Sequence, residues 1–500
     1  MSGALFDFVR ANAPILVLLA PLVAMAGAAL SPSGRGAWAI VLLGAAALTA
    51  AALAAAIGYD QRLSDPLGGW NAPLGVALRI DGLSAYALVL IGVFAMLGIG
   101  GGLGALRDEI DRERQPLAAA ATSAALAGAV GLLVAGDLFV LFAFLQWMWI
   151  ALGALTAMGA EHDRRAGPAA LNVVIVGAIG TGLFGFGAAL VFMSTGAADL
   201  DQVSGVLSAA EDTRSASAGL GLMAAGLAMA AGLAPLHAWA VGAFSRGPAW
   251  SAVALGALLP AAGAIAAGRL VALAASALAP GLQHGLSLGL SLLGAVGALA
   301  ASAQAMAARD FRRFAVYAGA AQAGCVAIGF SAASAGGVSG ALFQLANQTV
   351  SIFILYAAAA ALRSESGAGA PMQVLQGLGK RAPFLSLAIS AALLSLIGAP
   401  MTAGFLSRWS LLQATFEARI WWGAAGIILS SLASVIFAAR AFERMYLRAP
   451  APDAPRPRTT YLAPGLFIAA VMIIAFGFDG AAPLHAADAA AGSLNWGGGR

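Results

Sequence analysis

The chain has 500 residues, of which 61% are hydrophobic and 10% charged, and its mean hydropathy is +0.89. These values exclude a water-soluble globular domain and indicate a protein that lies largely in lipid. The formal net charge of +4 would suggest a nucleic-acid partner for a soluble protein, but here the arginines stand in short segments between apolar runs, where they report membrane topology.

Apolar runs long enough to cross a membrane recur along the whole chain. A hydrocarbon core of about 30 Å requires roughly 20 residues of helix. Runs of that length, bounded by charge, glycine or proline, predict an all-α membrane protein with about fourteen spans, near residues 13–30, 37–58, 82–105, 117–135, 138–158, 169–194, 217–241, 248–274, 281–306, 313–332, 336–362, 383–417, 420–444 and 460–478. A cleavable signal peptide ending near Ala28 is the alternative for the first run, which however lacks a basic leader.

The basic residues are distributed unevenly between the two sides that these spans define. If the N-terminus lies outside, eighteen of the 26 Lys and Arg residues fall in inside connections and six in outside segments, while Arg269 and Arg408 fall within spans. Positive charge is retained on the cytoplasmic side of membrane proteins. We therefore expect a multi-pass protein of the bacterial inner membrane with both termini in the periplasm.

Two of the predicted spans are interrupted by a glycine and a proline at similar positions. Gly232 and Pro235 stand in the seventh span, and Gly398 and Pro400 in the twelfth, so both helices should be broken. The two prolines are 165 positions apart, close to the 164 between the starts of the fourth and ninth spans. This predicts two inverted five-helix repeats, at 117–276 (helices 4–8) and 281–444 (helices 9–13), between an N-terminal region 1–116 and a C-terminal helix and tail 445–500. Ordinary proline kinks in an unrelated bundle are the alternative.

Several short motifs occur in the order found in one known family. They are Asp81-Gly-Leu-Ser, Asp137-Leu-Phe, Pro235-Leu-His237-Ala-Trp, Gly263 with Arg269, Asp310-Phe-Arg-Arg-Phe-Ala-Val-Tyr317 with Gln322-Ala-Gly, and Gly398-Ala-Pro400 with Gly404-Phe405. As a set they resemble the D subunits of Mrp-type cation/proton antiporters. The resemblance covers nearly the whole chain and extends to the antiporter-like subunits of respiratory complex I and of membrane-bound hydrogenases.

The resemblance implies a subunit of a large membrane complex that moves protons, and in some cases sodium, through buried ionisable groups. In such families the relay uses a Glu on the fifth span and Lys or His on the sixth, seventh, eighth, eleventh and twelfth. A lysine desolvated near a carboxylate can have its pKa drawn toward neutrality, so that modest changes in the local field load and unload protons.

This sequence departs from that pattern at the relay positions themselves. The matching residues are Gln146, Asn172, Ala230, Ala261, Gln348 beside Ile352, and Arg408. Losing only the lysine would leave a buried Glu unpaired at a cost of about 3–5 kcal/mol, whereas replacing both avoids that cost. Amides do not exchange protons near neutral pH and arginine stays charged, so we expect impaired proton conduction.

The remaining polar residues each allow a second interpretation. His237 could load protons, or it could be a neutral donor to carbonyls of the broken helix. Arg408 could set the local potential, hold a carboxylate of a neighbouring subunit, or form a structural ion pair. We expect Asp81 and Asp137 to cap helices, the basic inside residues Arg246, Arg312 and Arg313 to fix topology, and the segment 107–114 to be a solvated connector.

Three functional hypotheses follow. The first is a subunit of an Mrp-like antiporter or complex I-like pump, itself impaired in conduction. The second is a non-conducting scaffold that bridges other membrane subunits. The third places the chain in a quinone- or hydrogenase-linked oxidoreductase whose redox centres lie in partner subunits. The sequence predicts no catalytic centre, no cofactor and no metal site in this chain, because the single cysteine and four scattered histidines form no ligand cluster.

Overall fold

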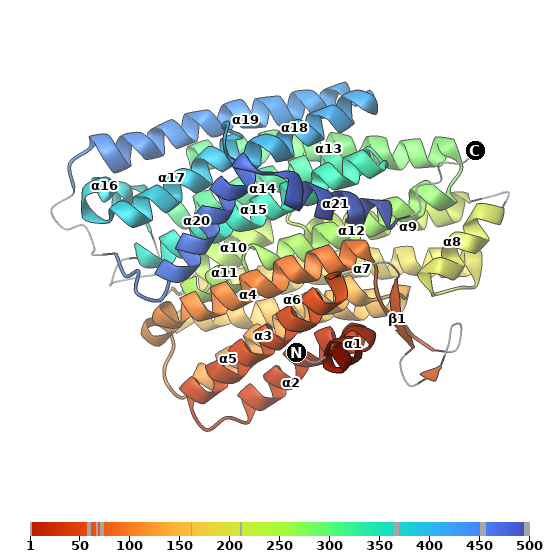
Figure 1. The fold of residues 1–500 in the computed structure, drawn as a ribbon, viewed down its shortest axis with the longest axis horizontal. Coiled ribbons are helices and arrows are strands. Elements are labelled where there is room, and N and C mark those ends of the chain that lie inside the picture. Colours follow the sequence, from red (N-terminus) through yellow and green to blue (C-terminus); the bar gives the residue numbers. More distant parts are fainter. Residues whose placement is uncertain are drawn as a thin grey trace.

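The computed structural model describes residues 3–57, 62–66, 69–70, 75–161, 163–210, 213–363, 370–450 and 457–494. Nearly all of these residues are helical, and most of the helices lie side by side along one direction (Figure 1). The predicted all-helical architecture is confirmed.

The N-terminal part contains four helices and one small hairpin. Its elements are α1 (Gly3–Ala11), α2 (Ala13–Ala29), α3 (Gly34–Ala56), β1 (Leu63–Pro66), β2 (Ala77–Ile80) and α4 (Gly82–Glu109). The two strands pair antiparallel, with Leu63 opposite Ile80. Sequence periodicity alone gave no sign of this hairpin, because each strand has only four residues.

The middle of the chain supplies the helices of the first predicted repeat. They are α5 (Gln115–Val134), α6 (Leu138–Ala157) with the short turn η2 (Met158–Glu161), α7 (Ala166–Thr195), α8 (Leu200–Ala209), α9 (Arg214–Ala230), α10 (Ala238–Arg246), α11 (Ala249–Leu255) and α12 (Leu258–Ala277). The predicted break of the seventh span is present between α9 and α10. The eighth span, predicted as continuous, is divided at Gly256 and Ala257, where the ring of Tyr356 packs against Gly256.

The last part holds the helices of the second predicted repeat and the C-terminal region. They are α13 (Pro280–Ala307), α14 (Phe311–Ser331), α15 (Ala335–Ala361), η3 (Met372–Leu375), α16 (Leu378–Arg381), α17 (Pro383–Ile397), α18 (Ala403–Glu417), α19 (Trp421–Phe442) with η4 (Glu443–Leu447), α20 (Ala463–Phe478) and α21 (Ala481–Gly492). The break of the twelfth span lies between α17 and α18, as predicted.

Ten helices in the described part of the chain are long and apolar enough to cross a membrane, or up to twelve if two pairs bent by 85° are each one span. The protein is therefore a multi-pass membrane protein. The predicted total of about fourteen spans stays a prediction, because broken elements such as α9, with 17 residues, and α17, with 15, are short on their own.

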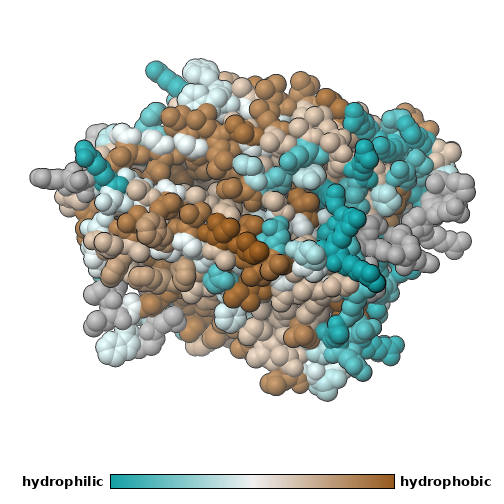
Figure 2. Space-filling model, turned by 180° about the vertical axis from the view of Figure 1, so that it is seen from behind, coloured by the Kyte–Doolittle hydropathy of each residue, from teal (hydrophilic) through white to brown (hydrophobic). Residues whose placement is uncertain are grey.

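Small residues bring neighbouring helices into close contact. A Cβ on Gly187 of α7 would lie 2.3 Å from the carbonyl oxygen of Gly219 on α9, and one on Gly226 would lie 2.4 Å from that of Gly180. Such backbone approach is typical of helix association in lipid, where apolar side chains gain little by leaving the solvent. Apolar side chains cover much of the surface, while hydrophilic residues gather mainly toward one end of the face shown in Figure 2.

Aspartates begin three of the long helices. The side chain of Asp81 accepts a hydrogen bond from the backbone N–H of Ser84, that of Asp137 from Phe139 and Val140, and that of Asp310 from Arg312 and Arg313. The capping roles predicted for Asp81 and Asp137 are confirmed.

Candidate functional site

Arg408 is the centre of a buried polar cluster in the second half of the chain. It lies on α18, one turn after the break, and is only 4% exposed. Its Nη2 donates to the carbonyl oxygen of Leu396 at 2.7 Å and to Oε1 of Gln322 at 3.1 Å. Its Nη1 donates to the carbonyl oxygen of Ile427 at 3.2 Å and to the hydroxyl of Ser431. One guanidinium thus contacts α14, α17 and α19 from its position on α18.

Two glutamines extend this cluster to α15. Gln344 donates through Nε2 to Oε1 of Gln322 at 2.7 Å, and its own Oε1 accepts from the hydroxyl of Ser407 at 2.8 Å. Both glutamines are at most 1% exposed. The amides that the sequence placed near the relay therefore bind one another and Arg408.

A second polar group lies beside the helix break. Ser395 accepts a hydrogen bond from the backbone N–H of Gly404 at 3.1 Å and donates to Oδ1 of Asn347. Gln348, one residue further along α15, donates to the carbonyl oxygen of Gly319 at 3.3 Å. Side chains here take up backbone groups near the break, as broken membrane helices require.

The charge of Arg408 is stabilised without a carboxylate. Among the ion pairs of the described residues, none includes Arg408. Its partners are carbonyl, amide and hydroxyl oxygens, which are the groups that a broken helix and its neighbours leave available. A buried charge inside a membrane bundle is expensive, so its retention points to a specific role.

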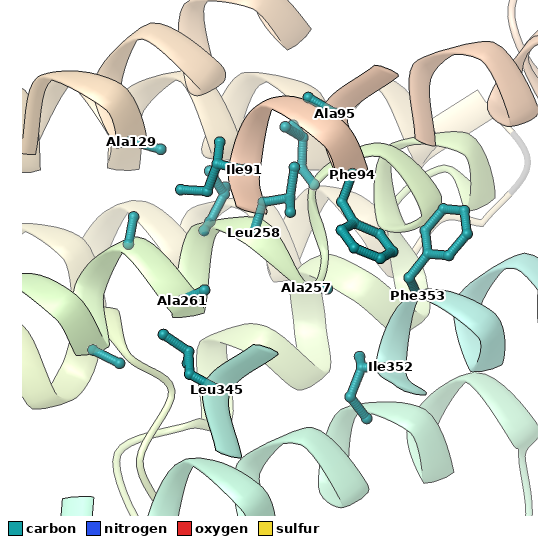
Figure 3. Packing of buried hydrophobic residues seen from close by; sticks show 14 of the residues in the cluster. Ile91, Phe94, Ala95, Ala129, Ala257, Leu258, Ala261, Leu345, Ile352 and Phe353 are labelled. Carbon is teal, nitrogen blue, oxygen red and sulfur yellow. The ribbon is translucent and has the colours of Figure 1, made fainter. Parts of the chain in front are cut away.

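Two of the predicted relay positions in the first half of the chain are apolar. Ala230, the last residue of α9, is 0% exposed, and Ala261 on α12 is 1% exposed. Figure 3 shows Ala261 among apolar side chains of α12 and α15, including Leu345 and Ile352. Neither position contains a titratable group.

Gln146 and Asn172 lie apart from the Arg408 cluster. They are half-buried on α6 and α7, and their side chains form no hydrogen bond with the described residues. Apolar residues beside them on both helices, such as Ile150 and Leu171, are 56% and 61% exposed. Of the predicted relay positions, the structure therefore places only Arg408 in this cluster: Gln348 binds the carbonyl oxygen of Gly319, and no hydrogen bond between described residues joins it, Gln146 or Asn172 to Arg408.

His237 lies within the first break, between α9 and α10. It is 4% exposed, its Nε2 lies 2.8 Å from Oε1 of Gln304 on α13, and its ring packs edge-on against Tyr317 at 5.8 Å between centroids. The short contact to an amide oxygen requires that Nε2 carry the proton. This contact satisfies Nε2 of a neutral histidine without an acid, whereas Nδ1 is buried with no hydrogen-bond partner among the described residues.

Ion pairs at the helix ends were missed by the sequence reasoning. At one end Arg269 donates to Oδ2 of Asp81 at 3.0 Å, with both side chains buried. At the other end Arg363 pairs with Asp108 at 2.5 Å and with Glu109 at 2.9 Å. The segment 107–114 is thus not simply a solvated connector, because its first three residues belong to α4 and two of them form ion pairs.

Arg312 also has more than the topological role predicted from charge counting. It is 1% exposed and donates to the carbonyl oxygen of Gly247, between α10 and α11, at 2.6 Å. Pairing of residues so distant in sequence leaves no local signal. Arg246 likewise binds a specific partner, Asp163, at 3.1 Å.

No group of three or more His, Cys, Asp or Glu side chains in the described ranges is arranged to hold a metal ion. The polar cluster in the second half instead contains one buried cation, Arg408, which is surrounded by neutral oxygen atoms.

Comparison with known proteins identifies the family. Residues 135–436 match the family model described as NADH:quinone oxidoreductase/Mrp antiporter, TM. The chain is 31% identical over 457 residues to NADH-quinone oxidoreductase subunit N of Desulforudis audaxviator, covering 90% of this chain and 89% of that protein.

Solved structures agree on the fold. One chain of an archaeal membrane-bound sulfane sulfur reductase superimposes with a TM-score of 0.86 at 22% identity, covering 96% of this chain and 97% of that one. A chain of the Mrp complex from Dietzia sp. gives 0.86 at 19% identity and covers 97% of each chain. The protein therefore belongs to the NADH:quinone oxidoreductase/Mrp antiporter transmembrane family.

Proposed function

We propose that this chain is a membrane subunit of a multi-subunit ion-translocating assembly, of the Mrp antiporter or complex I type, and that it is itself impaired in proton conduction. The observation that carries the proposal is the pair of buried alanines, Ala230 and Ala261, where the family resemblance expects lysine. A proton wire needs groups that gain and lose charge at its centre, and an alanine packed among apolar side chains cannot do so.

The polar residues that remain support the same proposal. Amides such as Gln322 and Gln344 can bind water but do not titrate near neutral pH, and an arginine such as Arg408 stays protonated. The second half therefore retains a fixed charge in place of one that is loaded and unloaded. A fixed cation can shape the potential for ions moving through neighbouring subunits without relaying protons itself.

Proton flux through proteoliposomes tests the proposal. We expect the intact assembly to keep its flux when His237→Ala is introduced, and the exposed His284→Ala serves as the matched control. Removal of the partner subunits should abolish the flux. The proposal would be refuted by pH-dependent flux that survives loss of the partners and disappears in His237→Ala alone.

The proposed inverted repeats, 117–276 and 281–444, are supported by two equivalent backbone pairings. Leu138 donates to the carbonyl oxygen of Ala198 and Leu200 to that of Gly136, both at 3.0 Å. In the second half, Phe311 donates to Ala370 at 2.7 Å and Met372 to Arg309 at 3.0 Å.

The first of these pairings adjoins α8 and the second leads into the segment before α16, and these two helices lie at opposite ends of the bundle (Figure 1). Equivalent contacts at opposite ends are what an inverted repeat requires.

The proposed topology places both termini in the periplasm of a bacterial inner membrane, between about fourteen spans. It is supported by the excess of basic residues in the connections assigned to the inside. Cysteine-accessibility labelling of single-cysteine variants in intact cells tests it. Arg112→Cys should be protected from an impermeant reagent, and Ser208→Cys, on α8, should react.

A second candidate is a scaffold subunit of a quinone- or hydrogenase-linked oxidoreductase. It is favoured by the exposed apolar faces of α6 and α7, which offer surface to other membrane subunits, and by the name of the relative from Desulforudis audaxviator. The scaffold predicts that Arg408→Ala lowers the yield of assembled complex before it affects transport. Normal complex yield with lost transport would count against it.

A further inference from the structure

The strongest unassigned feature is a charged cavity at the end of the bundle where α4 finishes and α20 begins. It has a volume of about 500 Å³ and lies between the last turns of α4 and α15 and the residues Thr460–Leu462 that lead into α20. Among the described residues, its walls include Arg107, Arg363 and Arg458 and one carboxylate, that of Asp108. The chemistry of the lining therefore favours an anion.

The charges around the cavity do not balance. Asp108 accepts from Arg363 at 2.5 Å and from Arg458 at 2.6 Å, and Arg363 also pairs with Glu109 at 2.9 Å. Arg107 pairs with neither acid. It donates to the hydroxyl of Tyr461 at 2.7 Å and stacks over that ring at 5.3 Å from its centroid. The guanidinium of Arg107 thus has no carboxylate partner within the part of the chain that the structure describes.

Further donors face the same space. Tyr461 accepts from Arg107, so its own hydroxyl proton is available to an anion. α20 starts at Ala463 beside the cavity, and the N-terminus of a helix favours negative charge. Arginine with hydroxyl and helix-terminus donors is a combination suited to a phosphate group.

An apolar pocket lies farther along the same two helices. It has a volume of about 280 Å³ and is lined from α4 by Val89, Val93 and Phe94 and from α20 by Met472 and Phe476. Several of these side chains are half-buried, so the pocket adjoins the membrane-facing surface.

The distance between the two cavities along α4 is close to the thickness of one leaflet of the hydrocarbon core. From Gly104 at the charged cavity to Val93 at the apolar one, α4 rises about 16 Å at 1.5 Å per residue. Half of a hydrocarbon core of about 30 Å is about 15 Å. A chain anchored at the charged cavity would therefore end in the apolar pocket.

We propose that the seam between α4 and α20 binds an anionic glycerophospholipid. Its phosphate lies against Arg107, Arg458 and Tyr461, and one acyl chain runs along α4 into the pocket at Val93. Basic pockets between membrane helices bind anionic headgroups in this manner. The site is distinct from the Arg408 cluster and does not depend on the proposed function.

Native mass spectrometry of the detergent-purified full chain tests the proposal. Titration with phosphatidylglycerol and with phosphatidylcholine should show one molecule of the anionic lipid bound roughly tenfold more tightly. Arg107→Gln should remove that preference, and Arg107→Lys should keep most of it. Arg112→Gln, an exposed arginine a few residues further along, is the matched control and should change nothing.

Other outcomes would overturn the proposal. Equal binding of the two lipids by the unaltered chain, or equal loss in Arg107→Gln and Arg112→Gln, would show that no specific site exists. Displacement of the lipid by millimolar inorganic phosphate would assign the cavity to a free anion. Val93→Trp fills the apolar pocket and should weaken phosphatidylglycerol binding severalfold, so unchanged binding in that variant would refute the position of the acyl chain.

Discussion

Helices α5–α12 and α13–α19 each contain a helix interrupted at Gly and Pro, but they differ in the side chains buried beside the break. The first half buries Ala230 and Ala261 among apolar side chains, with His237 bound to a single amide. The second half buries Arg408 in a cluster of amides, hydroxyls and free carbonyls. The comparison teaches that a broken helix can be held between apolar side chains on one side of the protein and within a hydrogen-bonded polar cluster on the other, without a buried carboxylate beside Arg408 or His237 among the described residues.

The largest effect is expected from a lysine in the first half. Ala261→Lys would bury a charge among apolar side chains, and we expect a loss on the order of 5 kcal/mol in the free energy of unfolding, or a failure to fold. Ala261→Met, similar in length and uncharged, should cost about 1–3 kcal/mol. Thermal unfolding of the purified variants checks this. Equal costs for the two would mean that water or an acid reaches this position.

Removal of the buried cation of the second half should have the next largest effect. Arg408→Ala would leave the carbonyls of Leu396 and Ile427 without a donor, at an expected cost of about 3–5 kcal/mol. The exposed Arg112→Ala should cost less than about 0.5 kcal/mol. The midpoints of thermal unfolding in detergent provide the comparison. A stable Arg408→Ala protein would show that the cluster is not structural.

The caps of the two halves should behave alike. Asp137→Ala and Asp310→Ala each remove a side chain that accepts two N–H bonds from the first turn of its helix, and loss of this cap should cost about 1 kcal/mol in each. Asp310 also accepts from the N–H of Ala370, so its replacement should cost slightly more. Similar shifts in the unfolding midpoint for the two variants would support the proposed repeat. A loss of stability in only one variant would count against it.

The smallest effect concerns pH at a helix end outside the spans. Partial burial opposes ionisation of Asp163, but the N–H of Arg165 and the guanidinium of Arg246 outweigh it and hold the pKa of this carboxyl below its ordinary value. The stabilisation is therefore complete above the unfolded pKa of about 3.9 and is lost as the pH falls through the lower folded value.

Asp163→Asn should accordingly cost about 0.5 kcal/mol at pH 7. The difference from the unaltered protein should shrink as the pH falls and vanish below the folded pKa of Asp163, as measured by unfolding midpoints across pH. Asp111→Asn, which changes an exposed aspartate on another connecting segment, is the control. If the unfolding midpoints of the two proteins still differed in acid, the contribution of Asp163 would come from packing or neutral hydrogen bonds and not from its charge.

Most of the fold could be predicted from the sequence, because the helices follow runs of apolar residues and end or break at local glycine, proline and aspartate residues. Gly232 with Pro235 and Gly398 with Pro400 located both breaks, and Asp137 before an apolar run located a cap. The division at Gly256 was missed because it depends on Tyr356, which packs against that glycine from a distant helix. The hydrogen bonds of Arg408 and the pairing of Arg269 with Asp81 join residues far apart in sequence, so no local pattern could predict them.

The C-terminal segment returns to an early part of the chain. The hydroxyl of Ser493 accepts a hydrogen bond from the N–H of Gly82, which starts α4 and lies 411 residues earlier, and Asp488 of α21 binds the hydroxyl of Ser339. Synthesis proceeds at about 5–20 residues per second, so this closing contact must wait at least some 20 s after α4 has emerged. During that interval the N-terminal end of α4 lacks the neighbour that Ser493 later supplies.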